Sequence, residues 1–209
     1  MIHAYDELYL AGAQNVLGHA FDFAVVTLGI DIDRFGRLFA VSDVSKQFAS
    51  GNPAYVAGRN GCEIARLVLD ETGYEYEDVE DAMYLDKSPE YWTGWATAFY
   101  QWHSGCSFYD IIAFKPFGEI VMMYHPYHEM DIRQFVDCMD ELRKNSLTRL
   151  RLYRDRLSES QSDLARDSGV AVRQIQLFEQ KQRDINKTSA ETLYKLSKSL
   201  NCRMEDLME

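Results

Sequence analysis

The chain has 209 residues, enough for two small domains, and a formal net charge of −11. Its four cysteines form no C-x-x-C pair, and no apolar run reaches the roughly 18 residues that a membrane helix needs. With no recognisable signal peptide, we expect a reduced, cytoplasmic protein that does not contact a membrane.

Residues 1–145 are predicted to be almost entirely helical. Apolar residues recur at steps of three and four from Leu10 to Leu28, and Gly29 follows as a stop signal. Further helices are predicted after Asp31, from about Gly61 to Glu71, from Ser88-Pro89 to Gly105, after Ser107, after Pro116, and from Asp131 to Lys144. This N-terminal region bears a faint resemblance to an uncharacterised helical domain, which implies no function.

The predicted helix after Ser88 carries an aromatic stripe. Trp92, Trp95, Phe99 and Trp102 fall on one helical face. Large aromatic residues at this spacing most often belong to a core, although Trp and Tyr also dominate protein interfaces. The sequence is compatible with both a core stripe and a protein interface.

Histidines at 125 and 128 stand beside Glu129, which are residue types that can bind a metal. The order is not H-E-x-x-H, and a proline between the two histidines favours a helix boundary, so we expect no metal site. The sequence shows no G-x-S-x-G, Walker or dinucleotide-binding motif. We therefore expect no enzyme, no catalytic residue and no cofactor.

Residues 160–186 carry the pattern that is most informative about function. Ser160 can cap a short helix, with Asp163 as the reciprocal half of a capping box. Gly169 stands where the chain must leave that helix with positive φ, and Val170 fills the corner. This spacing predicts a helix-turn-helix.

The second helix of this motif is predicted from about Val172 to Gln180. Ile175 and Phe178 face inward, while the outward positions are Arg173, Gln174, Gln176 and Leu177. A short helix that presents Arg and Gln outward is suited to reading base edges in a major groove.

Residues from about 147 to 209 resemble the Cro-repressor-like (Xre-type) helix-turn-helix family. The resemblance rests on the Ser160-Gln161 pair, which opens the second helix, and on the predicted helices around it. The resemblance implies a five-helix, lambda-repressor-like DNA-binding domain. It also implies an ion pair between Arg154 in the first helix and Glu179 in the third. Such a pair would fix the angle between the two helices.

The resemblance implies a set of DNA contacts. Arg173 is the predicted guanine contact, with Gln174 and Gln176 as secondary base readers. Gln161, Arg183 and Lys187 are predicted to bind phosphates. Val172 and Leu177 complete the predicted interface, with Leu177 either touching a thymine methyl group or shielding the helix.

The sequence departs from the family pattern at four positions. Ala171 stands where a capping Ser or Thr is usual, which should cost the third helix about 1 kcal/mol. Lys181 replaces the usual Gly after that helix, so it must adopt the left-handed conformation or end the helix differently. Glu159 occupies a position that is usually apolar, and Leu177 one that is usually polar.

The charge is divided unevenly between the two predicted domains. Residues 148–209 hold 12 Lys and Arg against 10 Asp and Glu, a net charge of +2. Residues 1–147 hold the other 10 Lys and Arg against 23 Asp and Glu, a net charge of −13. We expect domains at 1–145 and 146–209, of which the acidic first domain dimerises, senses a signal or binds a protein.

The chain is thus predicted to be an all-α, two-domain, sequence-specific transcription regulator, in the first place a repressor that binds double-stranded DNA as a homodimer. The alternative is an antitoxin whose acidic domain neutralises a basic toxin while its C-terminal domain controls its own operon.

Overall fold

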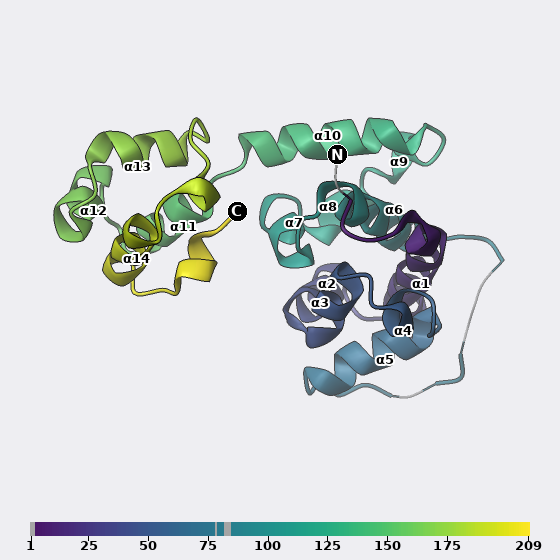
Figure 1. Ribbon diagram of the computed structural model, residues 1–209. Helices are drawn as coiled ribbons and strands as arrows, with labels where there is room; N and C mark the ends of the chain where they lie inside the picture. The colour runs from purple at the N-terminus through teal and green to yellow at the C-terminus, as the bar shows by residue number, and fades with distance from the viewer. Residues whose placement is uncertain (1–2, 78, 82–84) are drawn as a thin grey trace. The chain divides into compact units, whose positions relative to one another are not determined.

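The computed structural model describes residues 3–77, 79–81 and 85–209. It confirms the all-helical prediction, since none of these residues forms a strand. The chain divides into two compact units, residues 1–143 and 144–209, each with its own hydrophobic core (Figure 1). No helix among the described residues is long and apolar enough to cross a membrane.

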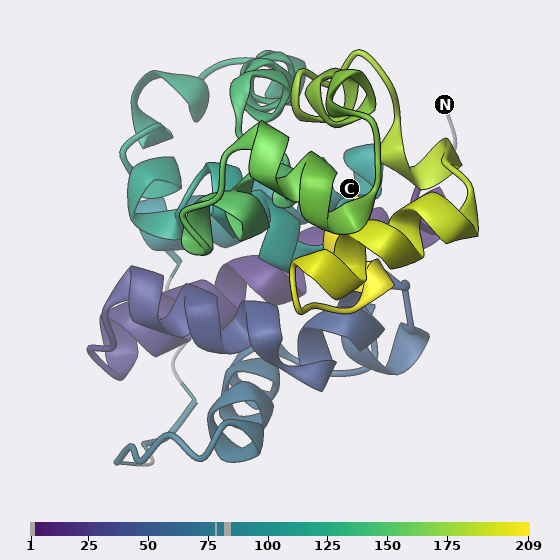
Figure 2. The ribbon, with the colours of Figure 1, turned by 90° about the vertical axis from the view of Figure 1, so that its left-hand side faces the viewer.

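Ten α-helices begin within the described residues of the N-terminal unit, and the last of them, α10, ends two residues beyond it. Their bounds are α1 Leu10–Asp22, α2 Ile32–Val41, α3 Asp43–Ala49, α4 Pro53–Val56, α5 Gly61–Glu71, α6 Pro89–Ser104, α7 Phe108–Phe114, α8 Phe117–Val121, α9 Tyr124–Tyr127 and α10 Ile132–Asn145. A short 3-10 helix, η1 (Glu7–Tyr9), precedes α1, and a π-helical turn, η2 (Phe23–Thr27), continues it. In the views of Figures 1 and 2, α5 lies at the lower end of this unit.

Most of the predicted helix starts are confirmed by their capping bonds. The side chain of Asp31 accepts the N–H of Arg34, and Ser88 and Ser107 cap α6 and α7 in the same way. Sequence reasoning missed α3 and α4, which are short and lack an extended periodic pattern. It placed a helix boundary between the two histidines, where the structure has the single turn α9, which ends at Tyr127.

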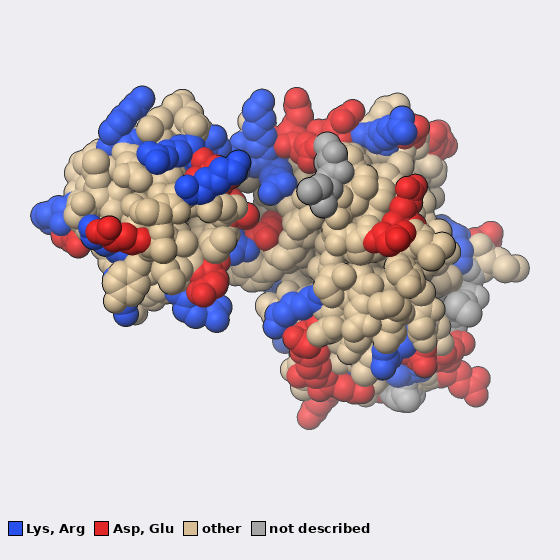
Figure 3. All heavy atoms as spheres, viewed as in Figure 1, with Lys and Arg blue, Asp and Glu red and all other residues tan. Residues whose placement is uncertain are grey.

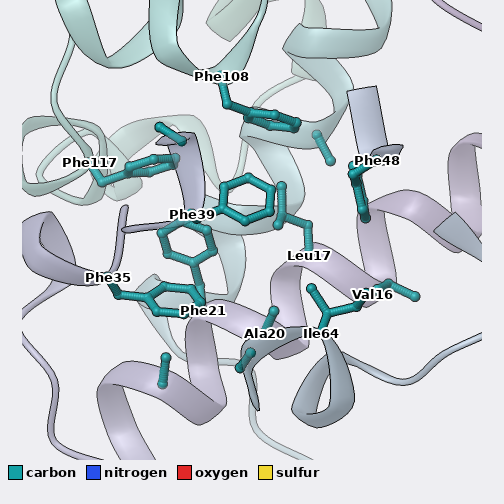
Figure 4. Packing of buried hydrophobic residues seen from close by; sticks show 14 of the residues in the cluster. Val16, Leu17, Ala20, Phe21, Phe35, Phe39, Phe48, Ile64, Phe108 and Phe117 are labelled. Atoms are coloured by element: carbon teal, nitrogen blue, oxygen red, sulfur yellow. The ribbon is translucent and has the colours of Figure 1, made fainter. Parts of the chain in front are cut away.

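Aromatic side chains from distant helices fill the core of the N-terminal unit. Phe21 of α1 meets Phe35 at 5.0 Å and Phe117 at 4.4 Å between ring centroids, and Phe39 meets Phe108 at 4.7 Å (Figure 4). All five rings are almost completely buried. Edge-on and tilted contacts of this kind add to the free energy of burial by about 0.5–1.5 kcal/mol a pair.

Helices α1 and α6 form the most extensive contact within this unit. They approach closely because glycines stand at the crossing: a Cβ on Gly94 would clash with the carbonyl oxygen of Leu17, and one on Gly18 would lie 2.8 Å from the ring of Tyr91. Side chains at this crossing would push the two backbones apart, so small residues are required there.

The aromatic stripe of α6 belongs to this core. Trp92 is 8% exposed and contacts the rings of Tyr124 and Phe135, and Trp102 is 5% exposed. The indole N–H of Trp102 donates to the carbonyl oxygen of Tyr5 at 2.9 Å. Trp95 and Phe99 are half-buried against the same core. The structure thus indicates that the aromatic stripe belongs to the core and not to an interface with another protein.

The C-terminal unit is a small helical bundle. Its helices are α11 Arg149–Arg156, α12 Gln161–Ser168, α13 Val172–Glu179, α14 Ala190–Ser199, and the 3-10 helices η3 Ile185–Lys187 and η4 Met204–Leu207. The fifth predicted helix is therefore the 3-10 turn η4. Leu207 is fully buried there, whereas Met204 is only half-buried and lies outside the core.

Candidate nucleic-acid interface

The start of α12 and the turn that follows it are built by local bonds that the sequence predicted. The hydroxyl of Ser160 accepts the N–H of Asp163, and the Asp163 carboxylate accepts the N–H of Ser160, both at 3.1 Å. Gly169 ends α12 at φ 69° and bonds the carbonyl of Ala165. Val170, 6% exposed, then anchors the corner. The capping box and the glycine stop are both confirmed.

Helix α13 is fixed through its buried face and its C-terminal end. Ile175 and Phe178 are at most 2% exposed and pack in the core of the unit with Leu150, Leu164 and Leu196. Ala171 provides no side-chain cap, as expected, and Lys181 takes the left-handed conformation at φ 53°. A lysine thus takes the conformation that glycine favours, at a cost in free energy.

Arg154 and Glu179 form a buried, two-pronged ion pair. The Nε of Arg154 lies 2.7 Å from Oε1 of Glu179, and its Nη2 lies 3.1 Å from Oε2. The two side chains are only 10% and 3% exposed. The bond to the Glu179 carboxylate raises the pKa of Arg154 above its usual range. Such a planar pair holds α11 against α13 in one orientation.

A third side chain, that of Gln161 at the start of α12, joins this pair. Its Nε2 donates to Oε2 of Glu179 at 2.8 Å, while Nη1 of Arg154 donates to the carbonyl of Glu159 at 2.6 Å. The carboxylate of Glu179 thereby connects α11, α12 and α13. Gln161 was predicted as a phosphate contact; its amide nitrogen carries two hydrogens, so one remains for a phosphate.

The outer face of α13 is set by the 3.6-residue period of the helix. Arg173, Leu177 and Gln180 lie at i, i+4 and i+7, directly opposite Ile175 and Phe178. Arg173 and Gln180 are exposed and Leu177 is half-buried. Sequence reasoning did not assign Gln180, although the same periodicity could have found it.

The remaining predicted base readers lie beside this outer face. Val172, Gln174 and Gln176 are half-buried on the flanks of α13, with Gln176 next to Arg173 and Gln174 on the other side. Arg173 and Gln180 on the outer face are thus more exposed than the two glutamines on its flanks.

Several cations of the C-terminal unit are neutralised by neighbouring carboxylates. Arg151, Arg166, Lys195 and Arg203 all form ion pairs within their own helix or turn. Within the described residues, those for which the structure shows no ion pair are Lys144, Arg156, Arg173, Arg183 and Lys198. Of these five, Arg173 lies on the outer face of α13, and Arg183 follows that helix in the chain.

The basic residues predicted to bind phosphates are open to solvent. Arg183 is exposed, with its guanidinium 5.8 Å from the centre of the Phe178 ring. Lys187 is 84% exposed at its side chain and has only a 3.4 Å contact with Asp184. In Figure 3, Lys and Arg side chains border the top of the C-terminal unit, where α13 lies in Figure 1. A phosphate could displace the weak surface pair of Lys187 at little cost.

The histidines at 125 and 128 are occupied by aromatic contacts. The ring of His128 stacks on Tyr124 at 4.0 Å, and His125 meets both rings edge-on. His128 also lies 3.5 Å from Glu129. Within the described part of the chain, no group of three or more His, Cys, Asp or Glu side chains is arranged to hold a metal ion.

Comparison with known families identifies the C-terminal unit. Residues 149–209 match the family model of the Cro/C1-type HTH DNA-binding domain. No curated protein and no solved structure matches the chain. The matched range begins at the first residue of α11 and covers the bundle, the glycine turn and the outer face of α13. The C-terminal unit is therefore a Cro/C1-type helix-turn-helix DNA-binding domain, and the protein that carries it is a DNA-binding regulator of transcription.

Proposed function

We propose that the protein is a sequence-specific repressor that inserts α13 into the major groove of double-stranded DNA. The observation that carries this proposal is Arg173, an exposed guanidinium on the outer face of a rigidly held helix, with no ion pair to any described residue. A guanidinium that is already paired would have to break that pair before it could bind guanine. Arg173 can bind the O6 and N7 atoms of guanine without this cost.

The other site residues take supporting roles. Gln174 and Gln176 contact bases from the flanks of α13, with Val172 beside them. Gln161, through the second hydrogen of its amide, and the exposed Arg183 and Lys187 bind phosphates and set the position of the helix in the groove. No catalytic step, metal or cofactor is part of this proposal.

We propose that the protein acts as a homodimer in the cytoplasm. Domains of this type commonly read two half-sites about one helical turn of DNA apart, and each half-site needs its own copy of α13. The N-terminal unit holds 9 Lys and Arg against 23 Asp and Glu, a net charge of −14. It therefore repels a phosphate backbone and is free to provide the dimer contact or to sense a signal.

The test is a gel-shift titration of the full-length protein on the DNA upstream of its own gene. The proposal expects a shifted band that survives an excess of random competitor DNA, with protection of two matching half-sites in a footprint. Equal competition by random and upstream DNA would show that the protein does not select a sequence there.

The charge of the N-terminal unit also favours a second candidate, an antitoxin. An acidic helical domain is suited to neutralising a basic toxin by electrostatic attraction. This function requires a small basic protein encoded beside this gene that co-purifies with residues 1–143. If the neighbouring product shows no binding to the N-terminal unit, the antitoxin function is excluded for that pair.

A further inference from the structure

Leu177 lies at the centre of the outer face of α13, where polar side chains would be expected. It follows Arg173 by one helical turn and precedes Gln180 by three residues. Leucine on the outer side of a DNA-reading helix requires an explanation, because it can form no hydrogen bond with a base edge.

The core of the C-terminal unit does not account for Leu177. That core consists of nine buried residues, and the half-buried hydrophobic residues against it are Tyr153, Ala165, Leu193 and Cys202. Leu177 is in neither group. Its backbone is nonetheless fixed, because its carbonyl oxygen accepts the N–H groups of Gln182 at 2.9 Å and Arg183 at 3.1 Å.

The major groove contains one apolar group that such a side chain can contact. This is the methyl group on C5 of thymine, which 5-methylcytosine carries at the same place. Side chains one helical turn apart have Cβ atoms about 5–6 Å apart. Successive base pairs rise by about 3.4 Å, since a helical turn of 10–10.5 base pairs spans 34–36 Å. Arg173 and Leu177 can therefore reach neighbouring base pairs.

Resting on the proposed function, we infer that Leu177 is a specificity residue that contacts the C5 methyl group of a pyrimidine beside the guanine bound by Arg173. Thymine is the expected base at this position of the half-site. Because the contact is with the methyl group alone, 5-methylcytosine satisfies Leu177 as thymine does, and unmethylated cytosine does not. Binding at this position thus depends on a methyl group rather than on a hydrogen-bonding pattern.

The experiment uses the full-length protein and duplex DNA enriched by it from a random pool. Each thymine of the enriched duplex is replaced in turn by deoxyuridine, which removes only the C5 methyl group. Loss of one buried methyl group corresponds to about fourfold weaker binding. We expect this loss at one thymine in each half-site for the wild type, and no difference between thymine and uracil there for Leu177→Ala.

A second arm distinguishes the two sources of the methyl group. Cytosine and 5-methylcytosine are compared at the same position, paired with guanine in both cases. The wild type should prefer 5-methylcytosine over cytosine by the same factor of about four, and Leu177→Ala should not discriminate between them. Gln180→Ala, on the same outer face, is the matched control and should retain the full sensitivity to uracil.

Two results would overturn the inference: binding by the wild type that is insensitive to uracil at every thymine, or sensitivity that Leu177→Ala retains. If Leu177→Ala does not fold by circular dichroism, Leu177→Met, which keeps an apolar side chain, must preserve the sensitivity and Leu177→Gln must abolish it. Failure to enrich any sequence would instead contradict the proposed function.

Discussion

Gln161 and Glu179 lie 18 residues apart in the chain, and the amide nitrogen of Gln161 donates to the Glu179 carboxylate at 2.8 Å. The same carboxylate holds both nitrogens of the Arg154 fork. A buried carboxylate is stabilised when several donors satisfy its lone pairs. Glu179 therefore couples the start of α12 to the orientation of α13, so one carboxylate positions both the proposed phosphate contact Gln161 and the helix proposed to read bases.

Removing either charge of the buried pair should destabilise the C-terminal unit. Arg154→Ala or Glu179→Ala leaves its partner buried without compensation, and we expect a loss of about 3 kcal/mol in the free energy of unfolding. Urea unfolding followed by circular dichroism measures this loss. The control is Arg166→Ala, whose ion-paired side chain is 68% exposed and should have no measurable effect. Equal stability of all three variants and the wild type would disprove a structural role for the pair.

Base reading and phosphate binding should give different phenotypes. Arg173→Ala should weaken binding to the cognate site by about 1–3 kcal/mol and to random DNA much less, because a bidentate contact with guanine is lost. Lys187→Ala should weaken both similarly and reduce the slope of log affinity against log salt by about one unit. Titrations at two salt concentrations separate the two. If Arg173→Ala weakens binding to cognate and random DNA equally, Arg173 does not recognise a base, and Gln174, Gln176 and Gln180 become the candidates for that role.

Acidic pH should destabilise the N-terminal unit through His19. Burial, together with Lys87 at 3.3 Å, lowers the pKa of His19 below 6.5, although Asp22 opposes this shift. The folded state therefore favours the neutral ring. The resulting stability is complete above pH 6.5 and is lost as pH falls through the lowered pKa. The melting temperatures of the wild type and of His19→Gln should diverge below pH 6.5, because the melting temperature of the variant falls less as the pH is lowered. Parallel curves would exclude His19 as the cause.

The glycine at the α1–α6 crossing should not tolerate a methyl group. Alanine at position 94 would gain about 1 kcal/mol in helix propensity. However, its Cβ would meet the backbone of Leu17, and overpacking of this kind typically costs about 1–3 kcal/mol. We expect Gly94→Ala to be destabilised in urea unfolding, and more so than Gly12→Ala, whose Cβ would lie 3.0 Å from the nearest backbone oxygen. If Gly94→Ala instead stabilises the protein, α1 and α6 can move apart at position 94 without a loss of packing energy.

A fragment of residues 146–209 should fold on its own and bind DNA weakly. Its core includes Leu150, Ile175 and Leu196, and the backbone N–H of Arg149 donates to the Glu209 side chain at 2.8 Å, which ties its two ends together. Circular dichroism should show a helical spectrum with a cooperative thermal transition. The full-length protein should bind a palindromic site more tightly, by dimerisation. An unfolded fragment would refute the proposed domain boundary.

The sequence by itself determined those features that depend on neighbouring residues. Helix starts at Asp31, Ser88 and Ser160 could be predicted because a cap bonds backbone groups two or three residues away. The glycine turn at Gly169 and the inward face of α13 follow equally local rules. These features suffice to predict a helix-turn-helix and an all-helical chain.

Only the tertiary structure decided features that join distant residues. Whether the Trp stripe of α6 was core or interface depended on Tyr124, Phe135 and Tyr5, which no local pattern connects to it. The bond between Gln161 and Glu179 likewise follows from the packing of three helices. The short helix α3 is stabilised by a tertiary contact: the Glu71 carboxylate, 28 residues away, accepts the N–H of Asp43 at its start.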